Sequence, residues 1–148
     1  MNNLFDFYKS VEDFANRHRM VRVFKLVNSV EDIDAINVDH RSFFLSLDST
    51  DISRDNNFVS IGFTAVVMDK ALSNDSDSVI ISSQENIFVI NEIQDFILLL
   101  GNDVEFEQVF IAQNSSSDYN VTAAICEFTV YFDRTVYCAS SESLNIEQ

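Results

Sequence analysis

Apolar positions near the start of the chain follow the spacing of an amphipathic helix. Within residues 3–17, hydrophobic side chains recur at i, i+3 and i+4, and polar or charged side chains take the opposite side. The apolar members are Leu4, Phe7, Tyr8, Val11, Phe14 and Ala15. Because this stripe is only one face wide, we predict a helix that packs against a sheet or a neighbouring element.

The next part of the chain shows the two-residue alternation that is typical of half-buried strands. We predict three strands, over residues 20–27, 43–49 and 58–69. The alternation is clearest in the third, where every odd-numbered position from Val59 to Val67 is apolar. Polar connections are predicted at residues 28–40, 49–57 and 70–78. Since proline is absent and glycine occurs only twice, these connections must turn on Asn, Asp and Ser.

A second helix is predicted over residues 82–101. Ser82 and Glu85 have the spacing of a capping box, and Gly101 stands where a glycine commonly ends a helix. One face is lined by Ile87, Ile90, Ile93, Ile97 and Leu100. The other side carries Asn91, Glu92 and Asp95, which we expect to form an exposed stripe.

The last third of the chain predicts further strands. One covers residues 104–113, with Glu105 and Glu107 on the same side, and a long strand or bent strand pair covers residues 119–138. The inward residues of the long strand are expected to be Ala124, Cys126, Phe128, Val130, Phe132 and Val136. Its outward residues are expected to be Glu127, Thr129, Asp133 and Thr135. The polar residues 139–148 are expected to be a flexible tail.

Together these elements predict an α+β fold in a single domain, residues 1–138. Short connections between consecutive strands favour antiparallel pairing over parallel crossovers. We therefore expect a mostly antiparallel sheet with an N-terminal helix and a second amphipathic helix packed on one face.

Composition narrows the class of protein. The 148 residues are 47% hydrophobic and include 14 phenylalanines, which is enough for a core and argues against disorder. No apolar run is long enough for a bilayer, and the first residues lack the basic and apolar regions of a secretory signal. Cys126 and Cys138 lie far apart along one predicted strand, so we expect two free thiols in a reducing compartment.

The charge of the chain is large and unevenly distributed. The formal net charge is −15, and residues 1–27 carry +2, which leaves −17 on the remainder. A field of that sign repels nucleic acid and argues against a DNA- or RNA-binding module. Two interpretations stay open at this point: general solubility, or a surface past which DNA moves without being held.

No motif in the sequence indicates catalysis. His18 lies among arginines without an orienting carboxylate nearby in sequence, and His40 lies in a predicted connection. The two glycines leave no phosphate-binding loop, and neighbouring acids such as Asp32 and Asp34 lack the central glycine of a calcium loop. We expect no enzyme activity, no cofactor and no metal, with a glycosidase-type acid pair as the remaining catalytic alternative.

Residues 58–138 also have a specific layout. A strand closes on Asp69, an LS-N-D loop follows, and a serine-rich segment starts a helix of the I-x-x-I-x-x-F-I kind, before a final strand that ends FTVYFDRTVYC. In this layout the chain resembles small neck proteins of tailed bacteriophages. These include tail-terminator proteins, head–tail joining proteins and the ring proteins of crAss-like phages.

The resemblance implies a tail-terminator-like fold and a structural role in the virion neck, for a protein made in the host cytoplasm. It implies a homo-oligomeric ring of roughly six or twelve copies that joins the portal to the tail and lets DNA pass without specific binding. No membrane is implied. The rival hypothesis is an acidic DNA mimic, monomeric or dimeric, that inhibits a nucleic-acid-binding enzyme.

Two sets of residues are candidates for such a role. The candidate subunit interface consists of Arg19, Arg22, Lys25, Asn91, Glu92 and Asp95. The candidate acidic channel or docking loop consists of Asp69, Asp75, Asp77 and Asp118. The weakly basic residues 1–27 would meet an acidic face of the next copy or of an adjoining ring.

Overall fold

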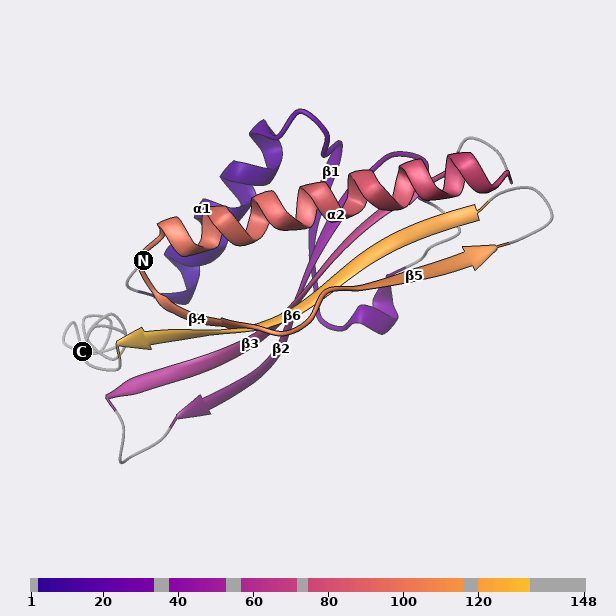
Figure 1. Ribbon diagram of the computed structural model, residues 1–148. Helices are drawn as coiled ribbons and strands as arrows, with labels where there is room; N and C mark the ends of the chain where they lie inside the picture. Colours follow the sequence, from indigo (N-terminus) through magenta and orange to yellow (C-terminus); the bar gives the residue numbers. More distant parts are fainter. Residues whose placement is uncertain (1–2, 34–37, 53–56, 72–74, 116–119, 134–148) are drawn as a thin grey trace.

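The structure, a computed structural model, describes residues 3–33, 38–52, 57–71, 75–115 and 120–133. Within these residues the chain forms two α-helices, one short 3-10 helix and a six-stranded sheet (Figure 1). The elements in chain order are α1 (Leu4–Arg17), β1 (Val23–Val27), η1 (Val30–Asp32), β2 (Ser42–Ile52), β3 (Phe58–Lys70), α2 (Ser76–Leu99), β4 (Asp103–Phe106), β5 (Phe110–Ser115) and β6 (Asn120–Asp133). The predicted α+β fold is confirmed.

The strands of the sheet lie in the order β1-β2-β3-β6-β4, and β5 also pairs with β6. All pairs are antiparallel except β1 with β2, so the prediction of a mostly antiparallel sheet is confirmed. The preference for antiparallel pairing between consecutive strands fails for the first two, because β1 runs parallel to β2. The connection over residues 28–41 is long enough to return the chain to the same end of the sheet.

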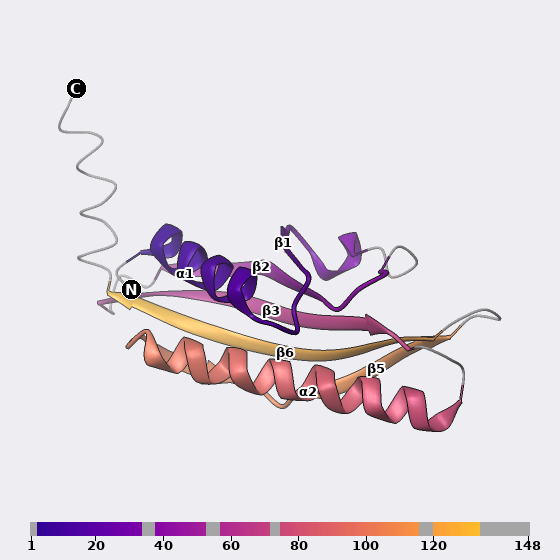
Figure 2. The same ribbon diagram turned by 90° about the horizontal axis from the view of Figure 1, so that it is seen from above.

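Both α-helices lie on one face of the sheet (Figure 1). Seen from above, α1 lies on the side of β1, β2 and β3, and α2 lies alongside it over β6 and β5 (Figure 2). The buried positions of α1 are Phe7, Val11 and Ala15, which belong to the apolar stripe predicted for this helix. The helices and the inward side chains of the strands together enclose the main core.

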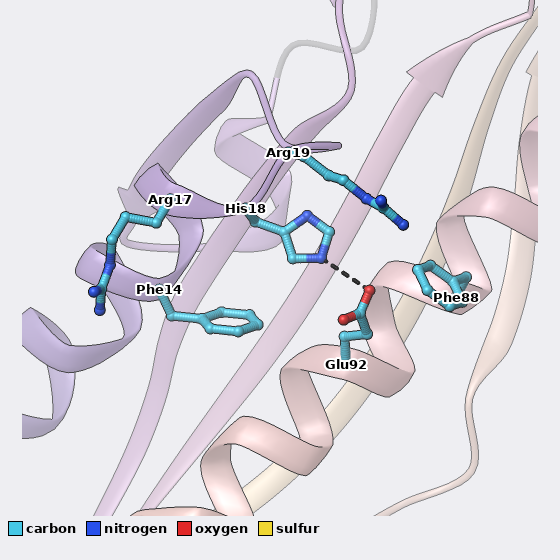
Figure 3. Close-up of a pocket in the computed structure, with 6 residues that line it drawn as sticks. All are labelled: Phe14, Arg17, His18, Arg19, Phe88 and Glu92. Carbon is cyan, nitrogen blue, oxygen red and sulfur yellow. Dashed lines mark hydrogen bonds and ion pairs between the residues drawn. The ribbon is translucent and has the colours of Figure 1, made fainter.

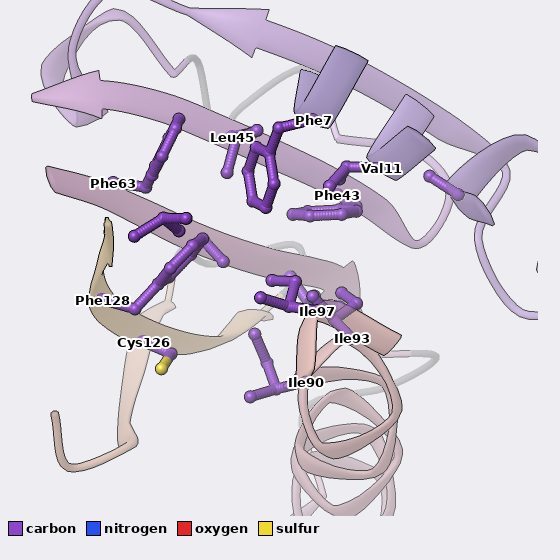
Figure 4. Close-up of a cluster of buried hydrophobic side chains, with 14 of the residues drawn as sticks. Phe7, Val11, Phe43, Leu45, Phe63, Ile90, Ile93, Ile97, Cys126 and Phe128 are labelled. Atoms are coloured by element: carbon purple, nitrogen blue, oxygen red, sulfur yellow. The ribbon is translucent and has the colours of Figure 1, made fainter. Parts of the chain in front are cut away.

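The centre of the main core is aromatic and aliphatic (Figure 4). The ring centroid of Phe7 lies 5.2 Å from that of Phe63 on β3 and 5.9 Å from that of Phe132 on β6. From α2, Ile90, Ile93 and Ile97 are buried in the same cluster. Five of the inward positions predicted for the last strand are buried, namely Ala124, Cys126, Phe128, Val130 and Phe132. Val136 and Thr135 lie outside the described residues, as do Cys138 and the predicted tail.

A smaller apolar cluster lies on the opposite face of the sheet. It contains Phe44, Val66 and Ala123, and Val38 from the connection that precedes β2. Ile33, which follows η1, packs against it, and Figure 1 shows η1 on the face away from the two α-helices. This connection covers only part of the face, so the remainder stays open to solvent.

The start of the second helix differs from the prediction. α2 begins at Ser76, and its N-cap is Asp75, whose side chain accepts a hydrogen bond of 2.7 Å from the Ser78 N–H. Ser82 is therefore not a cap but a buried helical residue. The prediction missed this start because an Asp N-cap satisfies the first free N–H groups as well as a capping box does. Gly101 has a φ of 87°, which confirms it as the residue that ends the helix.

Two strand boundaries also differ. β2 continues to Ile52 through residues that were predicted to turn, because an irregularity between Leu47 and Ser49 lets the pairing with β3 resume. The strand predicted over residues 104–113 is instead two strands, β4 and β5, which pair with different parts of β6.

Truncation of Phe7 tests how strongly α1 is held on the sheet. Phe7 is 0% exposed, so Phe7→Ala should lower the free energy of unfolding by about 3–5 kcal/mol, as measured by urea denaturation. Phe5 on the same helix is 67% exposed, and Phe5→Ala should change the value by less than about 0.5 kcal/mol. Equal losses for the two variants would show that α1 is not packed as described.

Candidate functional site

Exposed carboxylates gather on the sheet face that the α-helices leave open. They are called the acidic face here and comprise Asp48, Asp51, Asp103, Glu105, Glu107 and Glu127. The pairing register places Asp51 opposite Ser60, Asp103 opposite Tyr131 and Glu105 opposite Thr129. Because directly paired residues project to the same side of a sheet, acids from three strands share one surface.

Asp48 lies near the middle of this surface. One of its carboxylate oxygens accepts a hydrogen bond of 2.6 Å from the Ser46 hydroxyl, and the other accepts one of 2.5 Å from the Thr64 hydroxyl. Thr64 is paired with Glu127. The two hydroxyls hold Asp48 in place without neutralising its charge, since they add no positive group.

Within the part of the chain that the structure describes, few cations lie near these acids. β2, β4 and β6 contain no lysine or arginine, and β3 contains only Lys70, its last residue. Lys70 is paired with Val121, at the opposite end of β6 from Asp133. The strands that carry the acidic face therefore supply no cation close to it.

Burial and neighbouring carboxyl groups raise two pKa values on this surface. The pKa of Glu127 is raised above its usual value of 4.5, first by partial burial and then by the neighbouring carboxyl group of Glu107 and the charge of Asp48. The pKa of the Tyr131 hydroxyl is raised as well, by burial and by the adjacent Glu105. A folded chain that keeps such groups together bears an electrostatic cost at neutral pH.

On the helical side, α1 and α2 meet at a shallow pocket of about 450 Å³ (Figure 3). It is lined by Phe14, Arg17, His18, Arg19, Phe88 and Glu92. The His18 Nε2 atom lies 3.2 Å from Glu92 Oε1, and its Nδ1 atom accepts a hydrogen bond of 3.1 Å from the Met20 N–H. Because Nδ1 is an acceptor, the ring proton sits on Nε2 and is donated to Glu92.

Glu92 provides His18 with the orienting carboxylate that the residues next to His18 in the sequence do not supply. The two residues are 74 positions apart, so only the packing of α1 against α2 brings them together. The residues that line the pocket include no serine, threonine or cysteine that could act as a nucleophile beside the imidazole. The contact joins the end of α1 to the middle of α2.

A buried polar network lies beside the start of α2. The Arg41 side chain is 10% exposed, and its Nη2 atom lies 2.7 Å from Asp69 Oδ2 and 2.7 Å from Glu85 Oε2. Its Nε donates a hydrogen bond of 3.0 Å to Asn86 Oδ1. Asn86 in turn donates to the Thr122 hydroxyl, which also hydrogen-bonds Ser82. This network ties α2 to β3 and β6.

Asp69 therefore belongs to the interior and not to a docking loop. It is the penultimate residue of β3, and burial raises the pKa of its carboxyl group above the usual 3.8 even though Arg41 lies beside it and lowers it. Among the other predicted acids, Asp75 and Asp77 are exposed at the start of α2, away from the acidic face. Asp118 lies outside the described residues.

The residues predicted for a subunit interface fall into two places. Arg19, Arg22 and Lys25 are exposed around the end of α1 and along β1. Asn91 and Asp95 are exposed on α2, whereas Glu92 is partly occupied by His18. The outer side of α2 also exposes large apolar side chains that the predicted polar stripe did not include, namely Ile80, Ile81, Phe88, Leu98 and Leu99.

Three further kinds of functional feature concern the described residues: a metal site, a membrane-spanning helix and a reactive thiol. No three His, Cys, Asp or Glu side chains in the described ranges are arranged to hold a metal ion. Neither α-helix of the described chain combines the length and apolar character that a bilayer span requires. Cys126 is a free, buried thiol whose pKa is raised by burial, which disfavours the reactive thiolate.

The sequence matches no protein-family model and no curated protein.

Replacement of Arg41 tests how much the buried carboxylate of Asp69 destabilises the fold when its cation is removed. Arg41→Met leaves that carboxylate without its cation, so we expect the free energy of unfolding to fall by about 3 kcal/mol at pH 7. The loss should shrink as the pH falls, because protonation removes the uncompensated charge. Asp69→Asn added to Arg41→Met should recover part of the stability in urea denaturation. Lys9→Met, which breaks the exposed ion pair with Glu12, should cost less than about 1 kcal/mol.

The electrostatic coupling between Glu107 and Glu127 on the acidic face can be measured by NMR titration of side-chain carboxyl carbons. Glu127 should titrate above 4.5, and in Glu107→Gln its pKa should fall towards that value because one repelling neighbour is gone. The raised pKa means that the folded chain holds this proton more tightly than the unfolded chain, so the pair opposes folding above its pKa and ceases to do so on acidification. A Glu127 pKa unchanged by Glu107→Gln would contradict the coupling.

Proposed function

We propose that this chain is a non-enzymatic structural subunit that assembles with identical copies into a ring in the neck of a tailed bacteriophage. In this role it joins the portal to the tail and borders the path of the DNA. The observation that carries the proposal is the acidic face: six exposed carboxylates on one open sheet surface, whose strands bring no cation near them.

A DNA conduit has a clear electrostatic requirement. Each lysine or arginine that contacts a phosphate releases counterions and adds to binding, so a cationic wall would hold the DNA. A wall of carboxylates repels the phosphates and leaves the polyanion free to move. The acidic face suits this requirement because the strands that carry it, β2, β4 and β6, add no lysine or arginine beside its carboxylates.

Two further features support a structural role over an enzymatic one. The pocket between α1 and α2 holds an imidazole and a carboxylate without a nucleophile among its lining residues. The outer side of α2 exposes five large apolar side chains, of which Leu99 is 83% exposed. Apolar groups on the outside of a helix that also packs a core are typical of a surface that other subunits cover.

The acidic DNA mimic remains the second candidate, because the same six carboxylates would suit a basic partner. In that case the acidic face would be an interface in which cations of a nucleic-acid enzyme replace phosphate contacts. The two functions differ in assembly: a mimic acts as a monomer or dimer, and a neck protein acts as a ring.

Native mass spectrometry of the purified chain distinguishes them. The ring predicts assemblies whose mass is a multiple, roughly six or twelve, of the 16.9 kDa subunit, with no retention of duplex DNA at low salt. Asp51→Lys with Glu105→Lys should create salt-sensitive DNA retention, because two cations replace two repelling groups. A monomer or dimer that binds a cationic nucleic-acid enzyme tightly would contradict the ring and favour the mimic.

A further inference from the structure

The sheet has an unpaired strand at each edge. Within the described sheet, β1 pairs only with β2, and β4 pairs only with β6. Each of these short strands, of five and four residues, therefore keeps one row of backbone N–H and C=O groups that no described strand occupies. Such an edge can accept another strand, and charged side chains on it commonly prevent pairing with an unsuitable one.

The same kind of side chain faces the helices at both edges. On β1, Phe24 and Leu26 lie opposite core residues of β2. On β4, Val104 and Phe106 lie opposite core residues of β6. Because paired residues project to the same side of a sheet, these four apolar side chains lie on the helical face. They are half-buried or exposed, so each edge ends the apolar layer without closing it.

On the open face, the two edges carry opposite charge. Side chains alternate along a strand, so Lys25 of β1 lies on the open face, as do Asp103 and Glu105 of β4. The Lys25 side chain is exposed and forms no ion pair with another described residue. Each edge therefore repels its own kind and attracts the other edge. β5, which lies beside β6 on the same edge as β4, contains no charged residue, so charge favours β4 as the partner of β1.

We infer that β1 of one copy pairs with β4 of the next copy, with Lys25 opposite Glu105, so that the sheet continues from subunit to subunit. This inference rests on the proposed ring and names the surface that builds it. Within a subunit, β1 is parallel to β2, and the three antiparallel pairings from β2 to β3, β6 and β4 leave β4 antiparallel to β1. A head-to-tail repeat that continues the sheet preserves strand direction and face, so the new pairing is antiparallel.

One register of this pairing satisfies both faces of the sheet. With Lys25 opposite Glu105, the apolar layer beneath the helices continues across the contact, through Phe24 with Phe106 and Leu26 with Val104. A slip of one residue would turn the cation to the helical side of the next copy's sheet. A slip of two residues would keep the faces but leave an apolar residue of β1 opposite Asn102 or Gln108. The sequence of the two strands therefore specifies the register.

Charge selects this heterologous contact over the two-fold alternatives. Lys25 is the middle residue of β1, so a symmetric β1–β1 contact would bring it against its own copy. A symmetric contact at the other edge would bring Asp103 and Glu105 of the two copies together. Like charges at such short range oppose association, whereas the β1–β4 contact sets a cation opposite an acid. A heterologous contact of this kind closes into a ring when its rotation permits.

The contact also determines what each wall of the assembly presents. Because both α-helices lie on one face of the sheet (Figure 2), a continued sheet has the helices of every copy on one wall and the acidic face of every copy on the other. Lys25 compensates one acid at each contact between copies. Asp48 and Glu127 lie on inner strands, β2 and β6, so the acidic face stays negative between these contacts.

Cross-linking tests the contact directly. In a Cys138→Ser background, Val27→Cys combined with Asp103→Cys should give a ladder of covalent oligomers with a short bis-maleimide, because these positions lie opposite one another in the same register. The native Cys126 is buried and should not react. Each new cysteine alone should give no ladder, because a heterologous contact never joins two identical positions. A ladder from either single variant, or none from the pair, would overturn the inference.

The matched control for this cross-link is Val27→Cys combined with Ile111→Cys. Ile111 lies on β5, roughly 25 Å from Asp103 along the same edge of the sheet. The control pair should therefore give no ladder. A ladder from the control pair, and not from the Asp103 pair, would place β1 beside β5 and would overturn the inference.

Charge exchange supplies an independent test. Lys25→Glu should weaken self-association about tenfold or more, because it sets like charges opposite one another, and adding Glu105→Lys should restore the association. Lys9→Glu, a reversal on α1 away from the edge, should leave association unchanged. Failure of Glu105→Lys to rescue Lys25→Glu would contradict the pairing of the two edges.

The two proposals fail in different ways. A ring seen by native mass spectrometry without β1–β4 cross-links overturns the inference and leaves the ring. Cross-linked open filaments support the inference and overturn the ring. A chain that stays monomeric at low salt and at its highest soluble concentration overturns the inference.

Discussion

The structure depends on the burial of one sheet face, and only one, beneath two helices. Phe7 from α1 and Ile93 from α2 reach the same apolar layer over β3 and β6, and this layer provides most of the buried surface that such a chain needs to fold. Since the connection that contains η1 covers only part of the opposite face, the remaining strands must present polar groups to solvent. At many of those solvent-exposed positions the polar group is a carboxylate, and these carboxylates form the acidic face.

Cations accompany some acids of the described chain and not others. Where burial makes an acid costly, the chain supplies compensation: Arg41 contacts Asp69 and Glu85 and also donates to Asn86. On the open face, Asp48 receives hydroxyl donors, and no lysine or arginine of the described residues forms an ion pair with it. Of the other lysines and arginines that the structure describes, Arg19, Arg22 and Lys25 lie around the end of α1 and along β1, and Lys9 and Arg17 lie on α1. Within the described residues, a cation therefore accompanies the buried acid Asp69, whereas the strands of the acidic face, which we propose borders the DNA, bring no cation close to it.

Periodicity predicted the elements that bury one continuous face. The stripe of α1, the alternation of β3 and the inward residues of β6 were all correct, because each is set by residues close in sequence. Periodicity could not predict contacts between residues that are far apart in the sequence. His18 and Glu92 are 74 positions apart, and Arg41 and Asp69 are 28 apart. The alternation did place Glu105 and Glu107 on one side of their strand and Glu127 outward, but only the order of the strands shows that they share a surface. The acids chosen from sequence, Asp69 and Asp75, instead serve the interior and a helix cap.

The central claim is that the carboxylates of the open sheet face border a passage for duplex DNA. An electron-microscopy reconstruction of the assembled chain, at a resolution that separates helices from sheet, tests this most directly. The account predicts a central opening wide enough for duplex DNA, with the open sheet face turned towards it and α1 and α2 on the outside. An assembly whose opening is lined by the helices, or is too narrow for duplex DNA, would contradict it.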